Sequence, residues 1–207
     1  ALKNSKTRAV QHANHRLADV CRELPGVFIF DAARLAAEMG LERFYEPKLF
    51  FTSRLPFGTE AQQRLARFLA RYLRAIALPA KKCLVVDLDQ TLWGGILGED
   101  GIGGIALGED YPGNVFKNFQ RYLLALRNRG VLLAIASKNR MEDVKEVFER
   151  HPDCVLKLEH FSSVQAGWEE KDESLRAIAA ELNIGLDSLA FFDDSAFERE
   201  WIRRKLP

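Results

Sequence analysis

The stretch that most constrains the fold of this chain is Cys83 to Gly95, CLVVDLDQTLWGG. It opens with the apolar run Cys83 to Val86, a composition typical of a buried strand in a parallel sheet. Two carboxylates follow directly, Asp87 and Asp89. Side chains two residues apart in an extended segment point to the same face, so both carboxylates are expected to emerge together where the strand ends. In an open α/β sheet, that edge is where ligands bind.

Two like charges held this close are unfavourable unless a positive charge neutralises them. A hard divalent cation with oxygen ligands meets that need, and we expect Mg²⁺. The alternative interpretation of Asp87 and Asp89 is a strand that runs into an Asp-rich turn, because Asp is common in turns.

The composition bounds the class of protein. The chain has 207 residues, 47% of them hydrophobic, and its formal net charge of +1 argues against a general nucleic-acid binder. Its three cysteines lack metal-ligand spacing, which favours a reducing, cytoplasmic location without disulfides. No apolar run reaches transmembrane length and no signal-peptide pattern is found, so we expect no membrane partner. Because the sequence begins at Ala1 and ends at Pro207 soon after a helical pattern, we expect a fragment of a longer protein.

The first part of the chain is predicted to be mostly helical. Apolar spacing predicts helices over 1–24 and 59–78, and a further helix capped by Asp31 and ended by Gly40. A short strand is predicted at 27–30, and the aromatic segment 44–57 is predicted to be irregular. Pro79 and Ala80 mark a linker, so we expect domains at 1–80 and 81–207.

From Lys81 onward, strand patterns alternate with helix patterns, which predicts a doubly wound parallel sheet of the α/β class. The expected strands are 83–87, 131–136, 155–158 and 189–192, and the expected helices are 115–129, 141–150, 171–182 and 196–205. The Gly-rich stretch 94–113 is predicted to be a loop or a small β flap. No GxGxxG lies between a strand and a helix, which excludes a dinucleotide site of that type.

Polar clusters end three of these strands: Asp87/Asp89, Ser137-Lys138-Asn139, and Asp193-Asp194. Lys171 begins a helix just after Trp168, and the topology brings all four sets to one edge of the sheet. Each has a use in phosphoryl transfer. One carboxylate can attack phosphorus and a second carboxyl can transfer protons. Ser and Lys can hold phosphate oxygens, and acidic residues of the last strand can complete a Mg²⁺ site.

These motifs resemble, in order, the four motifs of the haloacid dehalogenase (HAD) superfamily of phosphotransferases. Within it, residues 81–207 resemble the FkbH-like branch in the segments TLWGGILGEDG, YLLALRNRG, IASKN, FERHPDCVLKLEHF and LNIGLDSLAFFDDSAFERE. Residues 27–80 resemble the segment that precedes the phosphatase-like domain there, the tail of an SGNH-hydrolase-like α/β domain. The resemblance implies a HAD-type, Rossmann-like sheet with helices on both faces, preceded by a partial SGNH-like segment.

The resemblance also implies a function. FkbH-like proteins are glyceryl transferase/phosphatases of polyketide biosynthesis, which dephosphorylate 1,3-bisphosphoglycerate and deliver a three-carbon acyl unit to an acyl carrier protein. It implies that Asp87 is the nucleophile that forms an aspartyl-phosphate, and that Asp89 is the general acid/base. Lys171 and Ser137 would bind phosphate.

The resemblance further implies a Mg²⁺ site formed by Asp87, Asp193 and the backbone carbonyl of Asp89, with Asp194 assisting. The remaining candidates for substrate or phosphate binding are Thr91, Trp93, Lys138, Asn139 and Trp168.

The sequence departs from the family pattern in three places. Gln90 stands where Asn is usual, Gly167 stands where Asn usually precedes the Trp, and Ala136 stands where many relatives carry Cys before the motif-two Ser. We expect that Cys to hold an acyl thioester. Here the enzyme-bound thioester is skipped, another Cys serves, or the residue was substituted to block transfer.

Several residues admit a structural interpretation. Cys83 and Cys154 are expected in the core. Trp93 and Trp168 either pack or line the substrate pocket. Lys138 and Asn139 are also compatible with an ordinary helix entry, since Asn caps well.

Alternatives to the whole function also stay open. One is a HAD phosphatase of a soluble phosphometabolite that uses no carrier protein. Another is a catalytically silent carrier-docking domain.

Overall fold

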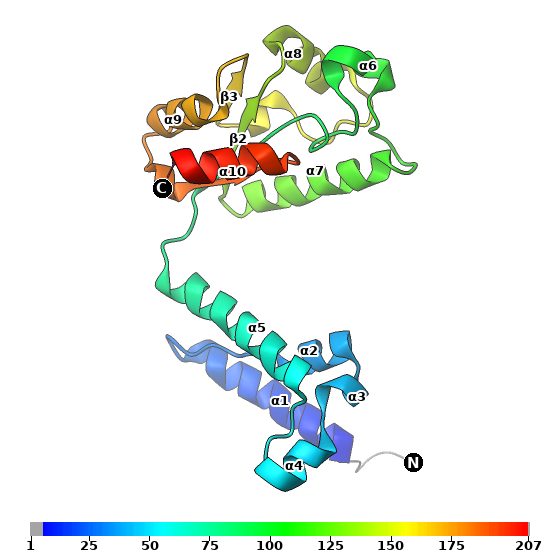
Figure 1. Ribbon diagram of the computed structural model, residues 1–207, viewed down its shortest axis with the longest axis vertical. Helices are drawn as coiled ribbons and strands as arrows, with labels where there is room; N and C mark the ends of the chain where they lie inside the picture. Colours follow the sequence, from blue (N-terminus) through cyan, green and yellow to red (C-terminus); the bar gives the residue numbers. More distant parts are fainter. Residues whose placement is uncertain (1–5, 207) are drawn as a thin grey trace. The chain divides into compact units, whose positions relative to one another are not determined.

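The computed structural model describes residues 6–206, and the chain divides into two compact units between Leu78 and Pro79 (Figure 1). The first unit is helical, with α1 (Lys6–Glu23), α2 (Ala32–Met39), α3 (Leu41–Phe44), α4 (Pro47–Ser53) and α5 (Thr59–Ala77). Its small core joins Leu35, Phe44 and Ala61. The predicted helices are confirmed, except that positions 1–5 of the first lie outside the described residues. Among residues 6–206, no helix is long and apolar enough to cross a membrane.

The first unit differs from the prediction in three ways. The α/β character implied for the SGNH-like segment is not seen, because residues 6–78 form helices and no strand. The strand predicted at 27–30 is not formed: residues 6–78 contain no strand that could pair with it, and an unpaired strand leaves its N–H and C=O groups unsatisfied. The segment 44–57 is less irregular than predicted. Pro47 occupies the first turn of α4, where its missing N–H is not needed, and the Glu46 side chain accepts a hydrogen bond from Lys48 N. Asp31 caps α2 as predicted, accepting from Arg34 N at 2.9 Å.

The second unit is built on a four-stranded parallel sheet in the order β3-β2-β1-β4. Its strands are β1 (Cys83–Val86), β2 (Leu132–Ser137), β3 (Ser163–Ala166) and β4 (Leu189–Phe192). Its helices are α6 (Leu97–Gly104), α7 (Gly113–Asn128), α8 (Met141–Arg150), α9 (Lys171–Glu181) and α10 (Ala196–Lys205), with short 3₁₀ turns η1 (Leu158–His160) and η2 (Leu186–Ser188).

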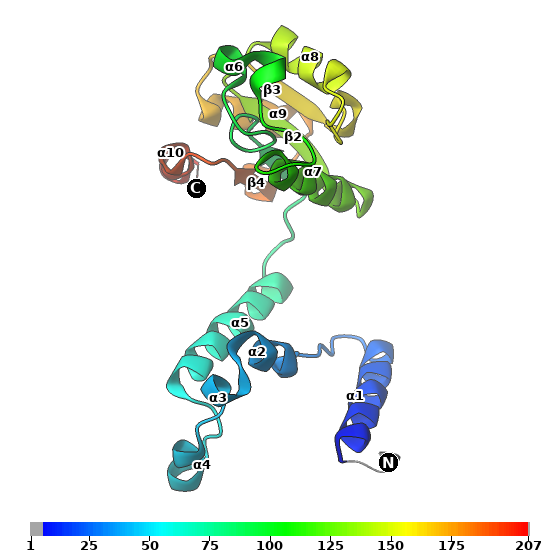
Figure 2. The same ribbon diagram turned by 90° about the vertical axis from the view of Figure 1, so that its right-hand side faces the viewer.

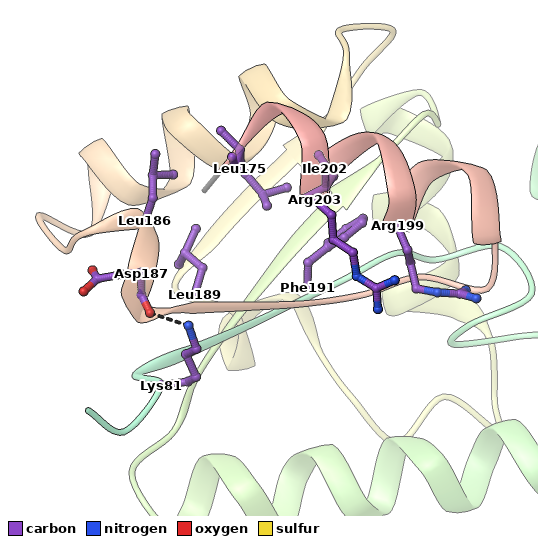
Figure 3. Close-up of a pocket in the computed structure, with 10 residues that line it drawn as sticks. Lys81, Leu175, Leu186, Asp187, Leu189, Phe191, Arg199, Ile202 and Arg203 are labelled. Atoms are coloured by element: carbon purple, nitrogen blue, oxygen red, sulfur yellow. Dashed lines mark hydrogen bonds between the residues drawn. The ribbon is translucent and has the colours of Figure 1, made fainter. Parts of the chain in front are cut away.

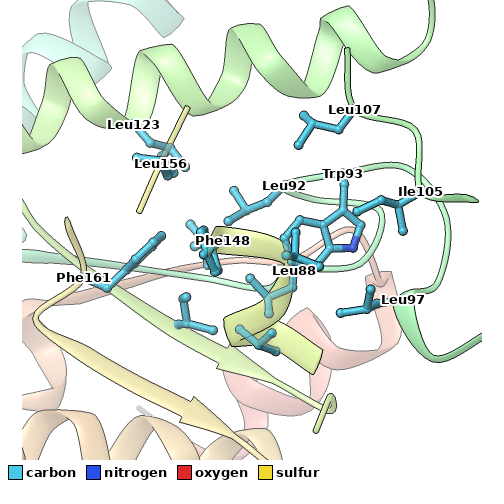
Figure 4. Close-up of a cluster of buried hydrophobic side chains, with 14 of the residues drawn as sticks. Leu88, Leu92, Trp93, Leu97, Ile105, Leu107, Leu123, Phe148, Leu156 and Phe161 are labelled. Carbon is cyan, nitrogen blue, oxygen red and sulfur yellow. The ribbon is translucent and has the colours of Figure 1, made fainter. Parts of the chain in front are cut away.

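Helices cover both faces of this sheet (Figure 2). Alternation along β1 sends Val86 into the core shared with α7 and α8, and Val85 into the core shared with α9 and α10. Figure 4 shows the first of these cores, where the loop after β1 contributes Leu88, Leu92 and Trp93. The predicted parallel sheet with helices on both faces is confirmed.

Two predictions about this unit were wrong in detail. The third strand lies at 163–166 and not at 155–158, because the N–H groups of Val155 and Leu156 bond to the side chain of Gln120 rather than to a neighbouring strand. The Gly-rich stretch contains a short helix, α6, in addition to the predicted flap. Gly101 breaks that helix at φ 65°, and paired hydrogen bonds between Gly94 and Ala106 close the flap.

Candidate active site

The carboxyl edge of the sheet gathers the polar clusters that the sequence places after its strands. Asp87 follows β1, Ser137 ends β2 and Asp193 follows β4. Asp87 N donates to Phe192 O at 3.0 Å, which fixes the end of β1 against the end of β4. The Asp193 carboxylate is buried, that of Asp87 is 14% exposed, and Asp194 is exposed. The solvent exposure of the carboxylates at this edge therefore increases from Asp193 through Asp87 to Asp194.

Asp87, Asp193 and Asp194 form one cluster that is suited to a cation. Each offers a carboxylate oxygen, and these oxygens all lie within 4.8 Å of one another. Three carboxylates so close repel one another, and a single lysine cannot balance them. An all-oxygen donor set is the kind that Mg²⁺, Ca²⁺ and Mn²⁺ prefer. The residues present thus fit the metal site that the sequence predicts.

The ammonium group of Lys171 contacts two carboxylates of this cluster. Its Nζ lies 2.8 Å from Asp87 Oδ1 and 3.1 Å from Asp193 Oδ2, and it donates to the backbone oxygen of Ala136 at 2.7 Å. The residue is only 3% exposed. Burial raises the pKa of Asp87, and the charge of Lys171 offsets only part of that effect. A bound cation would add a second positive charge that favours the ionised carboxylate.

The side chain of Asp89 is not part of the carboxylate cluster. Its Oδ1 accepts from Trp93 Nε1 at 2.9 Å and from Leu97 N at 3.1 Å, while its Oδ2 accepts from Asn139 Nδ2 at 2.9 Å. The sequence also led us to expect the Asp89 carboxylate to bind the cation together with those of Asp87 and Asp193, and the observed cluster does not include it. The metal role that the resemblance implies for the backbone carbonyl of Asp89 stays a prediction. The three donors fix the carboxyl group between the flap and the end of β2.

Asn139 and Trp93 therefore position Asp89. Asn139 is buried, and its amide also donates to Ser137 Oγ at 3.1 Å. It does not cap α8, whose N-cap is Arg140. Trp93 is fully buried and packs on Phe148, so of its two interpretations the structure favours packing. The alternative of a substrate-lining Trp stays open only for Trp168, which is 76% exposed.

Thr91 and Lys138 complete the predicted set. Thr91 is buried, and its Oγ1 has no hydrogen-bond partner within the described part of the chain. Lys138 is partly exposed, and its Nζ bonds Glu198 Oε1 at 2.9 Å and lies 3.9 Å from Glu170 Oε2. The hydrogen bond to Glu198 raises the pKa of Lys138, so Lys138 and Glu198 form an ion pair next to Ser137.

Sequence reasoning missed three residues that support the last motif. Ser195 N donates to Asp193 Oδ1 at 2.8 Å, and Arg199 NH1 bonds the backbone oxygens of Asp193 and Asp194. Glu198 was missed as the partner of Lys138. A signal for two of them was present, since Ser195 and Glu198 have the S-x-x-E spacing of a helix start, and Ser195 Oγ accepts from Glu198 N.

A solved structure is similar to this chain over almost all of its length. It is described as the crystal structure of the N-terminal part of the protein BF1531 from Bacteroides fragilis, containing a phosphatase domain complexed with Mg. The sequences are 35% identical and the TM-score is 0.87. The match covers 98% of this chain and 54% of that chain, so this chain spans about half the length of the solved one. No protein-family model and no curated protein matches the chain.

The comparison and the geometry support the same cofactor. The relative was crystallised with Mg, and the carboxylates predicted to bind Mg²⁺ here come together in one cluster. The prediction of a magnesium site therefore has two independent supports.

The cysteines offer no reactive thiol in the second unit. Burial raises the pKa of the Cys83 thiol and of the Cys154 thiol to about 11, so both stay protonated near neutral pH. Ala136 is fully buried in the core shared with α9, and its carbonyl rather than its side chain reaches Lys171. A cysteine at position 136 would be enclosed in the same way.

Proposed function

We propose that this chain is a Mg²⁺-dependent phosphatase that works through an aspartyl-phosphate on Asp87. The observation that carries the proposal is the cluster of Asp87, Asp193 and Asp194 around the buried ammonium of Lys171. The similar solved chain, which contains a phosphatase domain complexed with Mg, supports the same assignment.

In this proposal each catalytic step is assigned to a particular residue. Asp87 attacks phosphorus, and the leaving oxygen takes a proton from Asp89, which later deprotonates the water that hydrolyses the phosphoenzyme. Lys171 and Ser137 hold the non-bridging phosphate oxygens. Mg²⁺ would be held by Asp87 and Asp193, assisted by Asp194 and the backbone carbonyl of Asp89, and would offset the charge of nucleophile and phosphate.

We further propose the substrate and partner that the FkbH-like resemblance implies: 1,3-bisphosphoglycerate, and an acyl carrier protein of polyketide biosynthesis that receives the glyceryl unit. Lys138 would contribute to binding a second anionic group of the substrate only by exchanging its ion pair with Glu198 for one with the substrate, since its Nζ lies 2.9 Å from Glu198 Oε1. Trp168, which is largely exposed and follows Gly167, whose N donates to Ser137 O at 3.1 Å, would offer the substrate an apolar contact.

The absence of a cysteine at Ala136 favours direct acyl transfer to the carrier. In this route Asp87 takes the phosphoryl group of the 3-phosphate ester. The carrier thiol, on losing its proton, attacks C1 of the acyl phosphate, so that the C–S bond of the thioester forms, the C–O bond to phosphate breaks and phosphate leaves, without an enzyme-bound thioester. The high thiol pKa of Cys83 and of Cys154 supports this route, since a protonated, buried thiol is a poor nucleophile.

One experiment tests separately the proposed phosphatase activity and the proposed transfer of the acyl group to the carrier protein. Phosphate release from 1,3-bisphosphoglycerate is measured with and without Mg²⁺, while intact-mass spectrometry follows the acyl carrier protein. Mg²⁺-dependent release together with a glyceryl adduct on the carrier supports both activities. Release without an adduct leaves the alternative, a phosphatase of a soluble phosphometabolite. An adduct-free carrier that binds the chain, with no release from any phosphate ester tried, would favour the silent docking domain.

A further inference from the structure

A groove of about 370 Å³ lies along β4, and none of the three clustered carboxylate residues lines it (Figure 3). Its walls come from β4, α9, α10 and the turn η2. Leu189, Phe191 and Ile202 give it an apolar floor. Three basic side chains line it, Lys81, Arg199 and Arg203. The groove is thus apolar in depth and basic along its margin.

Two of the three basic groups of this groove pair with backbone oxygens, and the third has only a long ion pair with a carboxylate. Lys81 Nζ donates to the backbone oxygen of Asp187 at 2.6 Å, and Arg199 donates to two backbone oxygens. Figure 3 shows the Asp187 carboxylate pointing away from Lys81. Arg203 has one weak ion pair, with Glu200 at 3.8 Å, in which both side chains are largely exposed. Carbonyl partners orient the cations without cancelling their charge, so the groove carries a net positive potential.

We infer that this groove binds an amphipathic anion, a molecule with one anionic head and a short apolar chain. Arg199 and Arg203 stand one helical turn apart on α10, so both guanidinium groups can reach one head group. The apolar floor accepts a short alkyl or acyl chain, and the volume is in the range of small-molecule sites. This assignment does not rest on the phosphatase activity proposed above.

The groove is connected to the metal cluster through two of its own residues. Arg199 holds the backbone oxygens of Asp193 and Asp194, the two carboxylate residues that follow β4. The ring of Phe191 lies 5.7 Å from Lys171 Nζ. An anion that draws the Arg199 guanidinium toward itself competes with those backbone oxygens, so the occupied groove should loosen the metal-binding loop and weaken Mg²⁺ binding.

The binding test uses 1-octanesulfonate as the probe, followed by titration calorimetry on the whole chain in EDTA. Arg203→Glu reverses one charge of the groove. Arg204→Glu is the matched control, because Arg204 is the next residue of α10, pairs with the same Glu200, and does not line the groove. Wild type and Arg204→Glu should bind the probe, and Arg203→Glu should weaken binding about tenfold. Inorganic sulfate, which has the head without the chain, should bind at least tenfold more weakly.

Equal affinity of wild type and Arg203→Glu for 1-octanesulfonate would overturn the proposal, because it would mean unspecific apolar binding. Sulfate binding as tightly as 1-octanesulfonate would overturn the amphipathic assignment. Circular dichroism establishes that both variants are folded, as expected for side chains that are largely exposed.

The connection to the metal cluster is tested by a second calorimetric titration. Saturating 1-octanesulfonate should raise the Kd for Mg²⁺ about fivefold in wild type and in Arg204→Glu. In Arg203→Glu, at the same probe concentration, the shift should be much smaller. Identical Mg²⁺ affinity of the wild type with and without bound probe would contradict the coupling.

Discussion

Lys171 Nζ lies 2.8 Å from Asp87 Oδ1, although one residue begins α9 and the other follows β1. The same nitrogen reaches Asp193 beside β4 and the backbone oxygen of Ala136 in β2. One buried ammonium therefore joins the ends of three parallel strands. It also orients the carboxylate that we propose as nucleophile. We therefore expect Lys171 to contribute both to the stability of the fold and to the reaction.

Replacing Lys171 with Met is expected to damage both properties. Without the ammonium, Asp87 and Asp193 face each other with no positive partner, and loss of one member of a buried ion pair costs about 3–5 kcal/mol. The metal-free variant should melt well below wild type, and Mg²⁺ should restore part of the difference. Phosphate release should fall about 10²-fold or more even with Mg²⁺.

The control for this variant is Lys145→Met, because Lys145 is an exposed lysine of α8. Calorimetric melting with and without Mg²⁺, together with a phosphate-release assay, checks both expectations. Wild-type release by Lys171→Met would contradict the role given to the ammonium.

Replacing Asp87 with Asn should stabilise the metal-free fold while abolishing turnover. Burial raises the pKa of Asp87 above its usual 3.8, so the folded state holds a proton there more tightly than the unfolded state. The stability that this proton provides is complete below pH 3.8 and is lost as pH rises through the folded-state pKa. The advantage of Asp87→Asn should therefore grow as pH rises from about 4 through the folded-state pKa of Asp87.

Urea unfolding in EDTA across that pH range measures the effect. Adding Mg²⁺ should reverse the order, because the ion stabilises wild type more than a variant that has lost one charged ligand. A metal-free Asp87→Asn that is less stable than wild type at pH 7 would contradict the dominance of burial at this site.

Asn139→Ala tests the distinction between the proton-transfer carboxyl and the metal ligands. The variant removes the donor to Asp89 Oδ2 and to Ser137 Oγ. We expect kcat for phosphate release to fall about tenfold or more, because Asp89 loses its orientation. Mg²⁺ affinity should be nearly unchanged, since the Asp89 carboxylate lies outside the metal cluster. Asn118→Ala, at an exposed site on α7, serves as the control. A parallel loss of Mg²⁺ affinity would mean that the Asp89 side chain contributes to the metal site.

The sequence was sufficient wherever a local pattern also determines the structure. The apolar run before Asp87 and the alternation of strand and helix patterns after it predicted β1, α8 and α10 nearly to the residue. The sequence was insufficient where a side chain distant in the sequence determines the local structure. The side chain of Gln120 accepts hydrogen bonds from the N–H groups of residues 155 and 156, so these groups do not pair with a neighbouring strand as predicted. Likewise, the partners of Asp89 come from two other segments of the chain.

Gln90 departs from the family pattern, which usually has Asn at this position, and its backbone conformation suggests why Asn is usual there. Its φ is 53°, a left-handed conformation that Asn tolerates better than Gln. The usual Asn at this position thus has a conformational reason, and the Gln found here accepts some backbone strain next to Asp89.

The helix α5 carries a row of arginines that we expect to contribute to carrier docking. Arg64 pairs with Glu60, whereas Arg67 and Arg71 have no carboxylate within ion-pair distance among residues 6–206. Acyl carrier proteins are acidic as a class, so Arg67→Glu combined with Arg71→Glu should slow carrier association, most clearly at low salt. Phosphate release without carrier should not change.

A charge-matched control for this pair is Lys145→Glu with Arg150→Glu on α8, in the second unit. Stopped-flow association across a salt series separates the two double variants. If both bind the carrier at the wild-type rate at every salt concentration, the arginine row is simply a solvated helix face.

The central claim is that Asp87 becomes phosphorylated, and trapping the phosphoenzyme tests it most directly. The chain is incubated with Mg²⁺ and 1,3-bisphosphoglycerate, or with acetyl phosphate as a simpler donor, then quenched in acid and reduced with borohydride. Reduction converts an aspartyl-phosphate to homoserine, which peptide mass spectrometry locates. We predict homoserine at position 87 in wild type, more of it in Asp89→Asn because hydrolysis is slowed, and none in Asp87→Asn. Homoserine at another aspartate, or phosphate release by wild type without any trapped residue even in Asp89→Asn, would contradict the account.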